Sequence, residues 1–352
     1  MEHFAIIGSS PIMMLEAIHL ANIGKKVTII EKNPELGGAW KTFSHKQYNN
    51  IELGCHIWEY NKSSYKFIER NIGVELEKLR PVPLLIKDNI KFHYNRKEIP
   101  IIIIKSIKRI KELNFYTLFS EGVYFLRNKL FFRKVDYYYA KNGCNELTSK
   151  LIDKIKTSKD IKIEQQDVKK IISYNESVEL ISESKSIKCD RLLLPNNFEA
   201  DITIKSEPLN LKVGFDKEIY HCFIICNKSE ILSDFSYLRF IKHPIFHRVS
   251  NASFEEFKKL FPEKALLVVG VLAKAAKQEN INQLILQELK KKNLYDGTPE
   301  EMFWKEYKSK EYENSELRKV QKKSNGKISY IDTSCLSNGI FKQLKRWGDL
   351  KI

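Results

Sequence analysis

The sequence lacks the features that carry a chain into or across a membrane. No run of about 18 apolar residues occurs among its 352 residues, so no membrane-spanning helix is expected. The chain begins Met-Glu-His and goes straight into an apolar segment, without the basic start and small-residue cleavage site of a signal peptide. Its six cysteines are scattered, which favours reduced, mostly buried thiols. These absences predict a cytoplasmic protein.

Several signatures of catalysis and binding are also missing. There is no Gly-x-Ser-x-Gly elbow for acyl transfer and no Walker loop for phosphates. Neither an RNA-binding signature nor C2H2 zinc-finger spacing occurs, so no specific nucleic-acid partner is predicted. Cys222 and Cys226 lie four positions apart, as do His243 and His247. No complementary ligands accompany either pair, so no metal site is predicted.

Positive charge is what the sequence has in excess. Lys and Arg number 60 against 44 Asp and Glu, which gives a formal net charge of +16. Such a surface attracts nucleic acid, anionic lipid or a phosphorylated small molecule, but lysines spread along the whole chain also fit a general bias in composition. Residues 99–111 are apolar and then basic, which suits either peripheral membrane contact or a buried strand or helix start. The oligomeric state is not indicated.

The first 31 residues have the outline of a dinucleotide-binding βαβ unit. A short apolar strand ends at Gly8, a helical pattern of apolar residues follows, and Gly24 is a suitable helix stop. A second apolar strand ends at Glu31, 23 positions after Gly8. This separation is close to the roughly 20 residues expected between the glycine turn and the acid that binds a ribose.

The glycine fingerprint of this unit is incomplete. Where Gly-x-Gly-x-x-Gly is expected, the chain reads Gly8-Ser9-Ser10-Pro11-Ile12-Met13. Gly8 keeps the tight turn, and the hydroxyl of Ser10 can donate to a phosphate. Met13 stands at the third glycine and is expected to push the helix outward. The helix N-terminus still offers N–H groups and a positive dipole end to an anion.

A second glycine pair, Gly37 and Gly38, follows the acid. NAD-binding units do not need it, whereas it fits the flavoprotein pattern in which the loop passes close to the ribityl chain and pyrophosphate. Residues 4–42 therefore resemble the FAD-binding segment of the amine oxidase / protoporphyrinogen oxidase superfamily, and are most similar to the UDP-galactopyranose mutases. The resemblance implies FAD, bound along Gly8, Ser10, Glu31, Lys32, Gly37, Gly38 and Trp40.

The resemblance continues thinly over most of the chain. Residues 49–61 are similar to the mutase segment ending Gly-x-His-Ile-Phe, which implies that His56 lies beside the flavin ring. A neutral His there can hydrogen-bond the cofactor or shuttle a proton. By the same resemblance, the backbone of Val168 contacts the adenine. Arg248 reaches the flavin or the substrate phosphates, so His56 and Arg248 are the predicted catalytic residues.

Two departures from the family stand out. The glycine motif is degraded at Ser10 and Met13, and the C-terminal Gly-Arg pair that binds the flavin is missing. Asn338 and Gly339 are the remnant of that segment and are expected to open the last helix.

Each predicted site residue also has a plain structural interpretation. Glu31 fits a solvated acid at a strand end, and the glycine pair fits an ordinary turn. His56 fits a hydrogen-bonded, partly buried His, and Arg248 fits a surface ion pair. Aromatic residues that we interpret mainly as core, with a substrate contact as the alternative for the tyrosines, are Trp40, Trp58, Tyr137, Tyr138 and Tyr139.

The family interleaves its two domains. By resemblance, residues 1–60, 140–200 and 325–352 form the cofactor domain, and residues 61–139 and 201–324 form the substrate domain.

Two patterns in the second domain support packed structure independently. Residues 280–295 predict an amphipathic helix whose apolar side is Leu284, Leu286, Leu289 and Leu294. The apolar run at 264–274 predicts a buried strand in which Gly270 marks a bulge or a close approach.

The predicted fold is α/β, a Rossmann-like FAD-type domain with an interleaved α+β substrate domain. The predicted function is a flavin-dependent enzyme on a small anionic substrate, a nucleotide sugar or glycan precursor. By resemblance, its chemistry is redox transfer or, as in the mutases, attack by reduced flavin on the anomeric carbon; amine or porphyrinogen oxidation is the close alternative. A cofactor-poor relative that serves as a binding or assembly subunit is the alternative from a different class.

Overall fold

The structure is a computed structural model that describes residues 1–53, 56–79, 81, 84–87, 90–93, 136–331, 333 and 336–347. The apolar and then basic segment at residues 99–111, for which a buried strand or helix start and a peripheral membrane contact are the alternatives, lies outside the described residues. Among the described helices, none combines the length and apolar character needed to cross a membrane.

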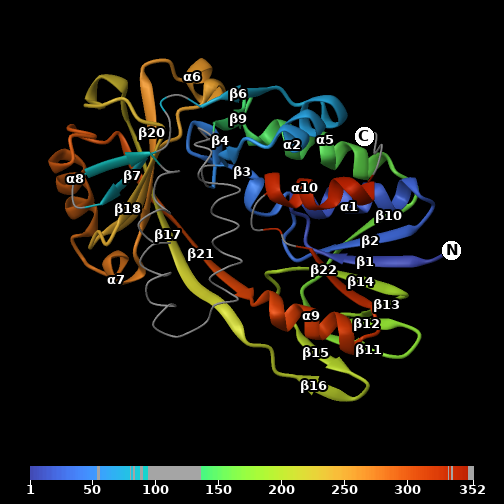
Figure 1. Ribbon diagram of the computed structural model, residues 1–352. Helices are drawn as coiled ribbons and strands as arrows, with labels where there is room; N and C mark the ends of the chain where they lie inside the picture. Colours follow the sequence, from blue (N-terminus) through green and yellow to red (C-terminus); the bar gives the residue numbers. More distant parts are fainter. Residues whose placement is uncertain are drawn as a thin grey trace, which may run out of the picture.

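A five-stranded parallel sheet lies at the centre of one side of the molecule (Figure 1). In spatial order its strands are β10 (Ile161–Gln165), β2 (Lys26–Glu31), β1 (His3–Ile7), β14 (Arg191–Pro195) and β22 (Ile328–Ile331). All its ladders are parallel. Because both faces are covered, most of these strands are nearly continuous apolar runs. The carboxyl ends of all five strands meet at one edge, where open α/β sheets bind ligands.

Helices cover one face of this sheet, namely α1 (Pro11–Asn22), α5 (Cys144–Thr157) and α10 (Leu336–Trp347). Ten of the 12 residues of α1 are buried, because α5 and α10 pack against it as well as the sheet. Met13 is fully buried in the same apolar cluster as Ile6 and Ile29. The side chain that replaces the third glycine is therefore part of the core.

A second sheet and α9 (Asn314–Lys323) cover the opposite face. In spatial order the strands of this sheet are β13 (Ser186–Cys189), β12 (Val178–Ser182), β11 (Val168–Ser173), β15 (Asp201–Ile204) and β16 (Glu207–Leu209). One apolar cluster joins Ala5 and Leu192 of the parallel sheet to Leu317 and Val320 of α9. Strands β15 and β16 belong to residues 201–324 in the predicted domain division, yet β15 pairs with β11 and β16 pairs with β15.

A seven-stranded sheet forms the other side of the molecule (Figure 1). Its spatial order is β21 (Glu301–Tyr312), β17 (Val213–Asn227), β20 (Lys264–Val271), β19 (Phe246–Asn251), β18 (Tyr237–Ile241), β7 (Leu84–Lys87) and β8 (Ile90–His93). Only the β18–β7 pair of this sheet is parallel among the described ladders. The long strands β17 and β21 run from this sheet toward the sheet that contains β15 and β16 (Figure 1).

The two faces of the seven-stranded sheet have different neighbours because side chains alternate along each strand. Cys222 and Ile224 of β17 face a cluster that includes residues of α7 (Ala273–Ala276) and α8 (Ile281–Lys291). Phe223 faces a cluster with Tyr48 of β4 (Tyr48–Glu52). The face of the seven-stranded sheet that carries Phe223 is therefore turned toward β4 and the domain of the parallel sheet.

The apolar side predicted for α8 is wrong in part. The helix ends at Lys291, so Leu294 is buried beyond it. Its buried residues are Ile281, Ile285 and Leu289. Leu284 and Leu286 are half-buried. The four-residue repeat of the buried positions follows the helical period.

Short elements connect these layers. The strands among them are the hairpin of β3 (Thr42–His45) with β4 and a three-stranded sheet of β5 (Trp58–Glu59), β9 (Tyr137–Ala140) and β6 (Leu76–Lys78). The helices are α2 (Lys62–Phe67), which continues into the π-helical turn Ile68–Ile72, and α6 (Glu255–Leu260). Two 3₁₀ turns cover Gly38–Trp40 and Lys228–Glu230. Trp58, Tyr137 and Tyr139 are buried, as predicted for core aromatics. The four described cysteines are free and buried.

The predicted fold class is confirmed, since a Rossmann-like parallel sheet is joined to a second, mostly antiparallel sheet domain. The exact domain division stays a prediction.

Candidate functional site

The first part of the site is the glycine turn at the carboxyl end of β1. Gly8 has φ +84°, a left-handed conformation that favours glycine, and its N–H donates to the carbonyl of Ile30 at 2.8 Å. Ser10 precedes α1 as its N-cap, but its side chain makes no capping hydrogen bond. The Ser10 Oγ is buried and has no hydrogen-bond partner among the described residues. A buried hydroxyl of this kind can donate to an anion at the helix N-terminus.

The second glycine pair lies directly against this turn. Gly37 and Gly38 have φ +111° and +57°, so both need the left-handed region. A Cβ on Gly38 would lie 3.5 Å from the Cα of Ser10, in ordinary van der Waals contact. The N–H of Gly37 donates to the Ser9 Oγ at 3.0 Å. The loop is thus held against the start of α1 by a residue of the fingerprint itself.

Glu31 is the predicted ribose acid, and its carboxylate is fully occupied. One oxygen accepts from the N–H and Oγ of Ser9, at 3.0 and 2.6 Å. The other accepts from the N–H and side-chain amide of Asn33, at 3.0 and 2.8 Å. A carboxylate has about four acceptor positions. A ribose hydroxyl fits here only by replacing one of these donors, and the exposed Asn33 amide is the most easily displaced.

His56 lies beyond the glycine loop, stacked on Trp40. The centroids of these two rings are 4.2 Å apart, and Trp58 is also stacked on Trp40, with 5.6 Å between ring centroids. The Nε2 of His56 is buried without a hydrogen-bond partner among the described residues. Burial lowers the pKa of His56 to about 4, with a smaller contribution from the charge of Arg248. The imidazole is therefore neutral at physiological pH.

Arg248 reaches across a neighbouring strand to His221. His221, Gly270 and Arg248 lie side by side on β17, β20 and β19. A Cβ on Gly270 would be 2.6 Å from the Arg248 Cγ and 2.9 Å from its Nε. The missing side chain of Gly270 therefore makes room for the arginine, whose Nη2 donates to the His221 Nε2. The close approach predicted at Gly270 is confirmed.

The described contacts of the Arg248 guanidinium are with neutral groups, and Arg239 of β18 lies opposite Arg248 in the sheet. His221 is fully buried, and its Nδ1 lies 2.8 Å from the carbonyl of Leu53. Burial, and then the Arg248 charge, lower the pKa of His221 to about 3. The Tyr307 hydroxyl lies 3.2 Å from the His221 Nε2. No carboxylate of the described residues forms an ion pair with Arg248, and its Nε is buried without a described hydrogen-bond partner.

These parts form a continuous path from the N-terminus of α1 to the seven-stranded sheet. Gly38 touches Ser10, Trp40 follows Gly38 in the same 3₁₀ turn, and Trp40 stacks on His56. The charge of Arg248 acts on His56 in turn. The structure thus brings the predicted glycine loop, His56 and Arg248 together between the two domains.

Four other predicted residues are placed differently. Lys32 is exposed and pairs with Glu199, its Nζ lying 3.2 Å from the carboxylate. Val168 is buried at the start of β11 in the cluster beneath the sheet. Asn338 and Gly339 were expected to open the last helix, but α10 already begins at Leu336. Their roles toward a cofactor stay predictions.

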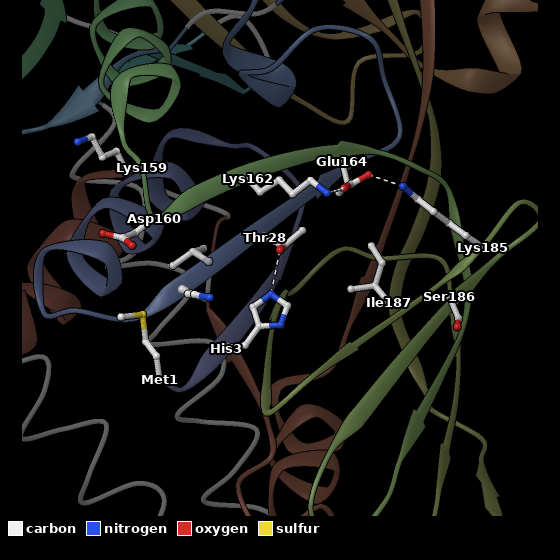
Figure 2. A pocket seen from close by; sticks show the side chains of 12 residues that line it. Met1, His3, Thr28, Lys159, Asp160, Lys162, Glu164, Lys185, Ser186 and Ile187 are labelled. Atoms are coloured by element: carbon white, nitrogen blue, oxygen red, sulfur yellow. Dashed lines mark hydrogen bonds and ion pairs between the residues drawn. The ribbon is translucent and has the colours of Figure 1, made fainter.

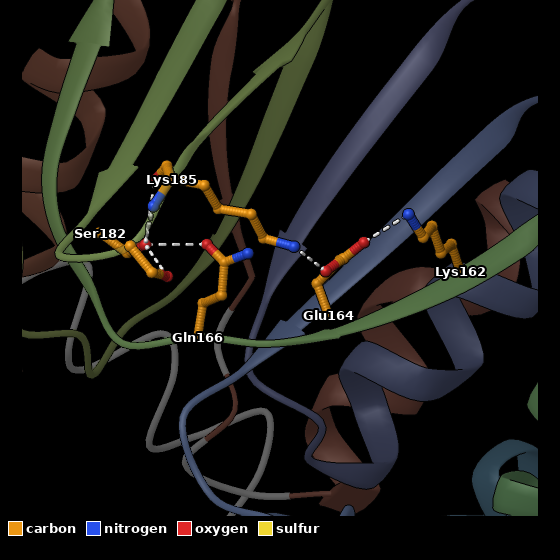
Figure 3. Close-up of polar contacts among 6 residues, drawn as sticks. Lys162, Glu164, Gln166, Ser182 and Lys185 are labelled. Carbon is orange, nitrogen blue, oxygen red and sulfur yellow. Dashed lines mark hydrogen bonds and ion pairs between the residues drawn. The ribbon is translucent and has the colours of Figure 1, made fainter.

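A second hollow lies at the opposite edge of the parallel sheet (Figure 2). This pocket of about 710 Å³ is lined at the amino ends of β1 and β2 by His3 and Lys26, among others. Glu164 at its wall accepts from both Lys162 and Lys185, each at 2.5 Å (Figure 3). None of the predicted site residues lines it. Its location at the amino ends is the wrong edge for a dinucleotide, which binds at the carboxyl ends.

Sequence reasoning missed four residues of the site. His221 and Tyr307 stand in apolar or charged strands without a motif. The register of β17 and β20 places His221 opposite Gly270, and the Tyr307 hydroxyl reaches His221 from β21. Glu52 and Cys144 lie 92 positions apart, yet the Cys144 N–H donates to the Glu52 carboxylate at 2.9 Å. The one available signal was Gly270, a glycine inside a buried strand.

The parallel sheet, the glycine turn and the acid define a dinucleotide-binding fold of the Rossmann class. Residues 6–70 match a family model described as an NAD(P)-binding Rossmann-like domain. This match covers the opening βαβ unit and continues past His56.

Solved structures with the same architecture extend the likeness over nearly the whole chain. A protein from Exiguobacterium sp. 255-15 described as a protoporphyrinogen oxidase has a TM-score of 0.66 at 11% identity, with 98% of each chain covered. Putrescine oxidase bound to putrescine has a TM-score of 0.62 at 12% identity, covering 99% of this chain and 98% of that one. Reduced UDP-galactopyranose mutase has a TM-score of 0.63 at 14% identity, covering 94% of this chain and 89% of that one.

The TM-scores show a shared fold at these low identities, and the predicted resemblance to the amine oxidase / protoporphyrinogen oxidase superfamily is confirmed as a likeness of fold. None of the curated proteins matches the chain in sequence.

Proposed function

We propose that this protein is a flavin-dependent enzyme that binds FAD along the glycine turn and acts on a small anionic substrate of the nucleotide-sugar class. The observation that carries the proposal is the Arg248 guanidinium, which is held among neutral groups and has no carboxylate partner among the described residues. A cation kept in this way is ready for a phosphate or carboxylate of a ligand.

The residues of the first domain fit FAD with one adjustment. The buried Ser10 Oγ and the N-terminus of α1 suit the pyrophosphate. Gly37 and Gly38 permit the loop to pass closely. Glu31 suits a ribose once the Asn33 side chain moves aside, which costs about one exposed hydrogen bond, or 0.5–1.5 kcal/mol. Pro11 removes one N–H from the helix N-terminus, so the hydroxyl of Ser10 becomes the more important donor.

The bound flavin would supply the electron-transfer or nucleophilic chemistry. The chain's own residues would prepare the site around it. Neutral His56 would accept or donate one hydrogen bond through Nε2 without adding charge. Arg248 would bind the substrate anion, and His221 would hold its Nη2. Trp40 and Trp58 would exclude water from the His56 side.

The test is the absorbance spectrum of freshly purified protein between the near ultraviolet and the blue, before and after FAD is added. Flavin bands that stay with the protein through gel filtration are expected. Ser10→Ala should weaken FAD uptake, whereas Lys162→Met at the opposite edge of the sheet should leave it unchanged. A folded, colourless protein that ignores added FAD overturns the proposal.

The substrate class has its own test in the FAD-loaded protein. Binding of UDP-galactose should exceed that of galactose, because only the nucleotide sugar carries the diphosphate for Arg248. Arg248→Met should remove this preference. Equal binding of both ligands, or a preference for putrescine, would contradict the nucleotide-sugar assignment and leave FAD binding intact.

The alternative function, a cofactor-poor binding or assembly subunit, is favoured by the saturated Glu31 carboxylate. Ser10→Gly distinguishes the two functions. If the native chain binds no FAD and this variant does, the Ser10 side chain blocks the site and the alternative is supported. Met13→Gly is less informative, since removing this buried side chain leaves a cavity that costs about 2–5 kcal/mol.

A further inference from the structure

Three metal-ligating side chains from separate segments converge beneath Trp40. Glu52 ends β4, His56 follows four residues later, and Cys144 is the first residue of α5. One ligand atom from each lies within 4.8 Å of the other two. The sequence predicts no metal because Cys144 is 88 residues beyond His56 and the three donors belong to no spacing motif.

The state of His56 is the second observation. Its ring hydrogen-bonds to the backbone of Ala39, while its Nε2 is buried without a partner among the described residues. A His ligand to a metal has the same arrangement, with one nitrogen fixed by a backbone carbonyl and the other presenting a lone pair. Without such a partner, a buried nitrogen that accepts no hydrogen bond destabilises the folded state.

Glu52 and Cys144 are already joined through the fold. The Cys144 N–H donates to Glu52 Oε1 at 2.9 Å, and its Sγ donates to the carbonyl of Trp40 at 3.2 Å. Glu52 is 5% exposed and Cys144 is fully buried. A buried carboxylate needs hydrogen bonds or a cation to offset its charge. Both side chains are therefore held in place before any ion arrives.

We propose that Glu52, His56 and Cys144 bind a divalent cation of the zinc type. The nitrogen, sulfur and oxygen donors suit Zn²⁺ or Co²⁺, whereas Mg²⁺ and Ca²⁺ prefer oxygen alone. Around a tetrahedral ion the ligand atoms lie roughly 3.3–3.8 Å apart. Side-chain rotations that move the ligand atoms by about 1 Å would therefore complete the site. Three protein ligands leave a fourth position open.

The binding step balances in charge. Cys144 loses its S–H proton to solvent and exchanges its hydrogen bond to Trp40 for a sulfur–metal bond. The thiolate and the Glu52 carboxylate then neutralise the two charges of the ion, and His56 contributes a neutral lone pair. Because a proton is released, binding should tighten as the pH rises. The ion would use the His56 Nε2 that the proposed function assigns to a hydrogen bond at the flavin site. The two contacts therefore exclude each other at this atom, and this inference does not rest on the proposed function.

The experiment is a Co²⁺ titration of chelator-treated, FAD-free protein, followed by competition with Zn²⁺. A thiolate-to-cobalt charge-transfer band in the near ultraviolet should grow to one ion per chain and disappear when Zn²⁺ is added. Cys144→Ser should abolish the band while keeping a hydroxyl that can donate to Trp40. Cys189→Ser, which changes a buried thiol of β13 away from this site, is the matched control and should keep it.

Glu52→Gln keeps an acceptor for the Cys144 N–H, so it tests the site even if Cys144→Ser fails to fold. Co²⁺ should bind this variant at least about tenfold more weakly. A thermal melt checks that each variant is folded. Wild-type protein that is folded and shows no band at saturating Co²⁺ overturns the inference, as does a full band in folded Cys144→Ser.

Discussion

Two cationic regions, one on the outer strand of the parallel sheet and one in the seven-stranded sheet, pair their charges differently. Lys162 and Lys185 share the carboxylate of Glu164 on β10, the outer strand of the parallel sheet. Arg248, at the interface beyond the carboxyl edge, contacts the neutral His221. An arginine without a carboxylate partner can bind an anionic ligand with its full charge. The charges of the two lysines are partly neutralised by the glutamate that they share. With a net charge of +16, the number of cations says little, and the partner of each cation decides its role.

The largest expected effect is on stability in acid. The pKa of His221 is depressed to about 3, so the folded protein keeps this ring neutral while the unfolded chain is protonated below about 6.5. Stability should therefore fall as the pH falls from 6.5 toward 3, by up to about 1.4 kcal/mol per pH unit.

Urea unfolding of wild type and His221→Asn measures this slope between about pH 7 and pH 4. The substitution should reduce the slope, because Asn does not titrate and the acids common to both proteins cancel in the comparison. Identical slopes would show that His221 is not buried beside Arg248 in the folded state.

The next effect comes from the space that Gly270 leaves for Arg248. Gly270→Ala adds a Cβ 2.6 Å from the Arg248 Cγ and 2.8 Å from the His247 Cε1, and should destabilise the fold by about 1–3 kcal/mol. It should also weaken binding of an anionic ligand by moving the guanidinium.

Gly214→Ala is the matched control on β17, because its Cβ would first meet the side chain of Glu313 at 3.0 Å, which can move. Urea midpoints and ligand titrations of both variants give the comparison. If Gly270→Ala were as stable and as active in binding as Gly214→Ala, Arg248 would not cross β20 in solution.

Ligand binding separates the two cationic regions directly. Arg248→Met should weaken binding of UDP to the protein by roughly 10- to 150-fold, the worth of a charged hydrogen bond of about 1.5–3 kcal/mol. Lys185→Met should change the affinity for UDP by less than about twofold, because this lysine is paired with Glu164 on the outer strand β10. Isothermal titration at one salt concentration compares the two variants, and the reverse order of effects would move the anion site to the Glu164 cluster.

The smallest expected effect is that of the surface carboxylate itself. Glu164→Gln breaks both of its lysine contacts, yet it should cost only about 0–1 kcal/mol, since Lys162 and Lys185 are largely exposed and water replaces the contacts. The difference should shrink in high salt. Urea unfolding at two salt concentrations measures it, and a loss well above this range would mean that the Glu164 cluster is a structural centre.

Much of the first domain could be predicted from local patterns. The apolar strand before Gly8, the helix that follows and the strand that ends at Glu31 depend on periodicity and turn chemistry within about 30 residues, and the structure has them at His3–Ile7, Pro11–Asn22 and Lys26–Glu31. The apolar face of α8 was predicted less well, because Leu and Ile residues surround the helix and only packing selects Ile281, Ile285 and Leu289.

The sequence by itself determined the dinucleotide-binding unit and its altered fingerprint at Ser10 and Met13, and it singled out His56, Arg248 and Gly270 as candidates. Only the tertiary structure decided that the Glu31 carboxylate is saturated by its own chain, that His221 holds Arg248 across Gly270, and that Glu52 and Cys144 meet beside His56. The physical reason is that hydrogen-bond partners and buried charges depend on strand register and on contacts between residues tens to hundreds of positions apart, which no local pattern records.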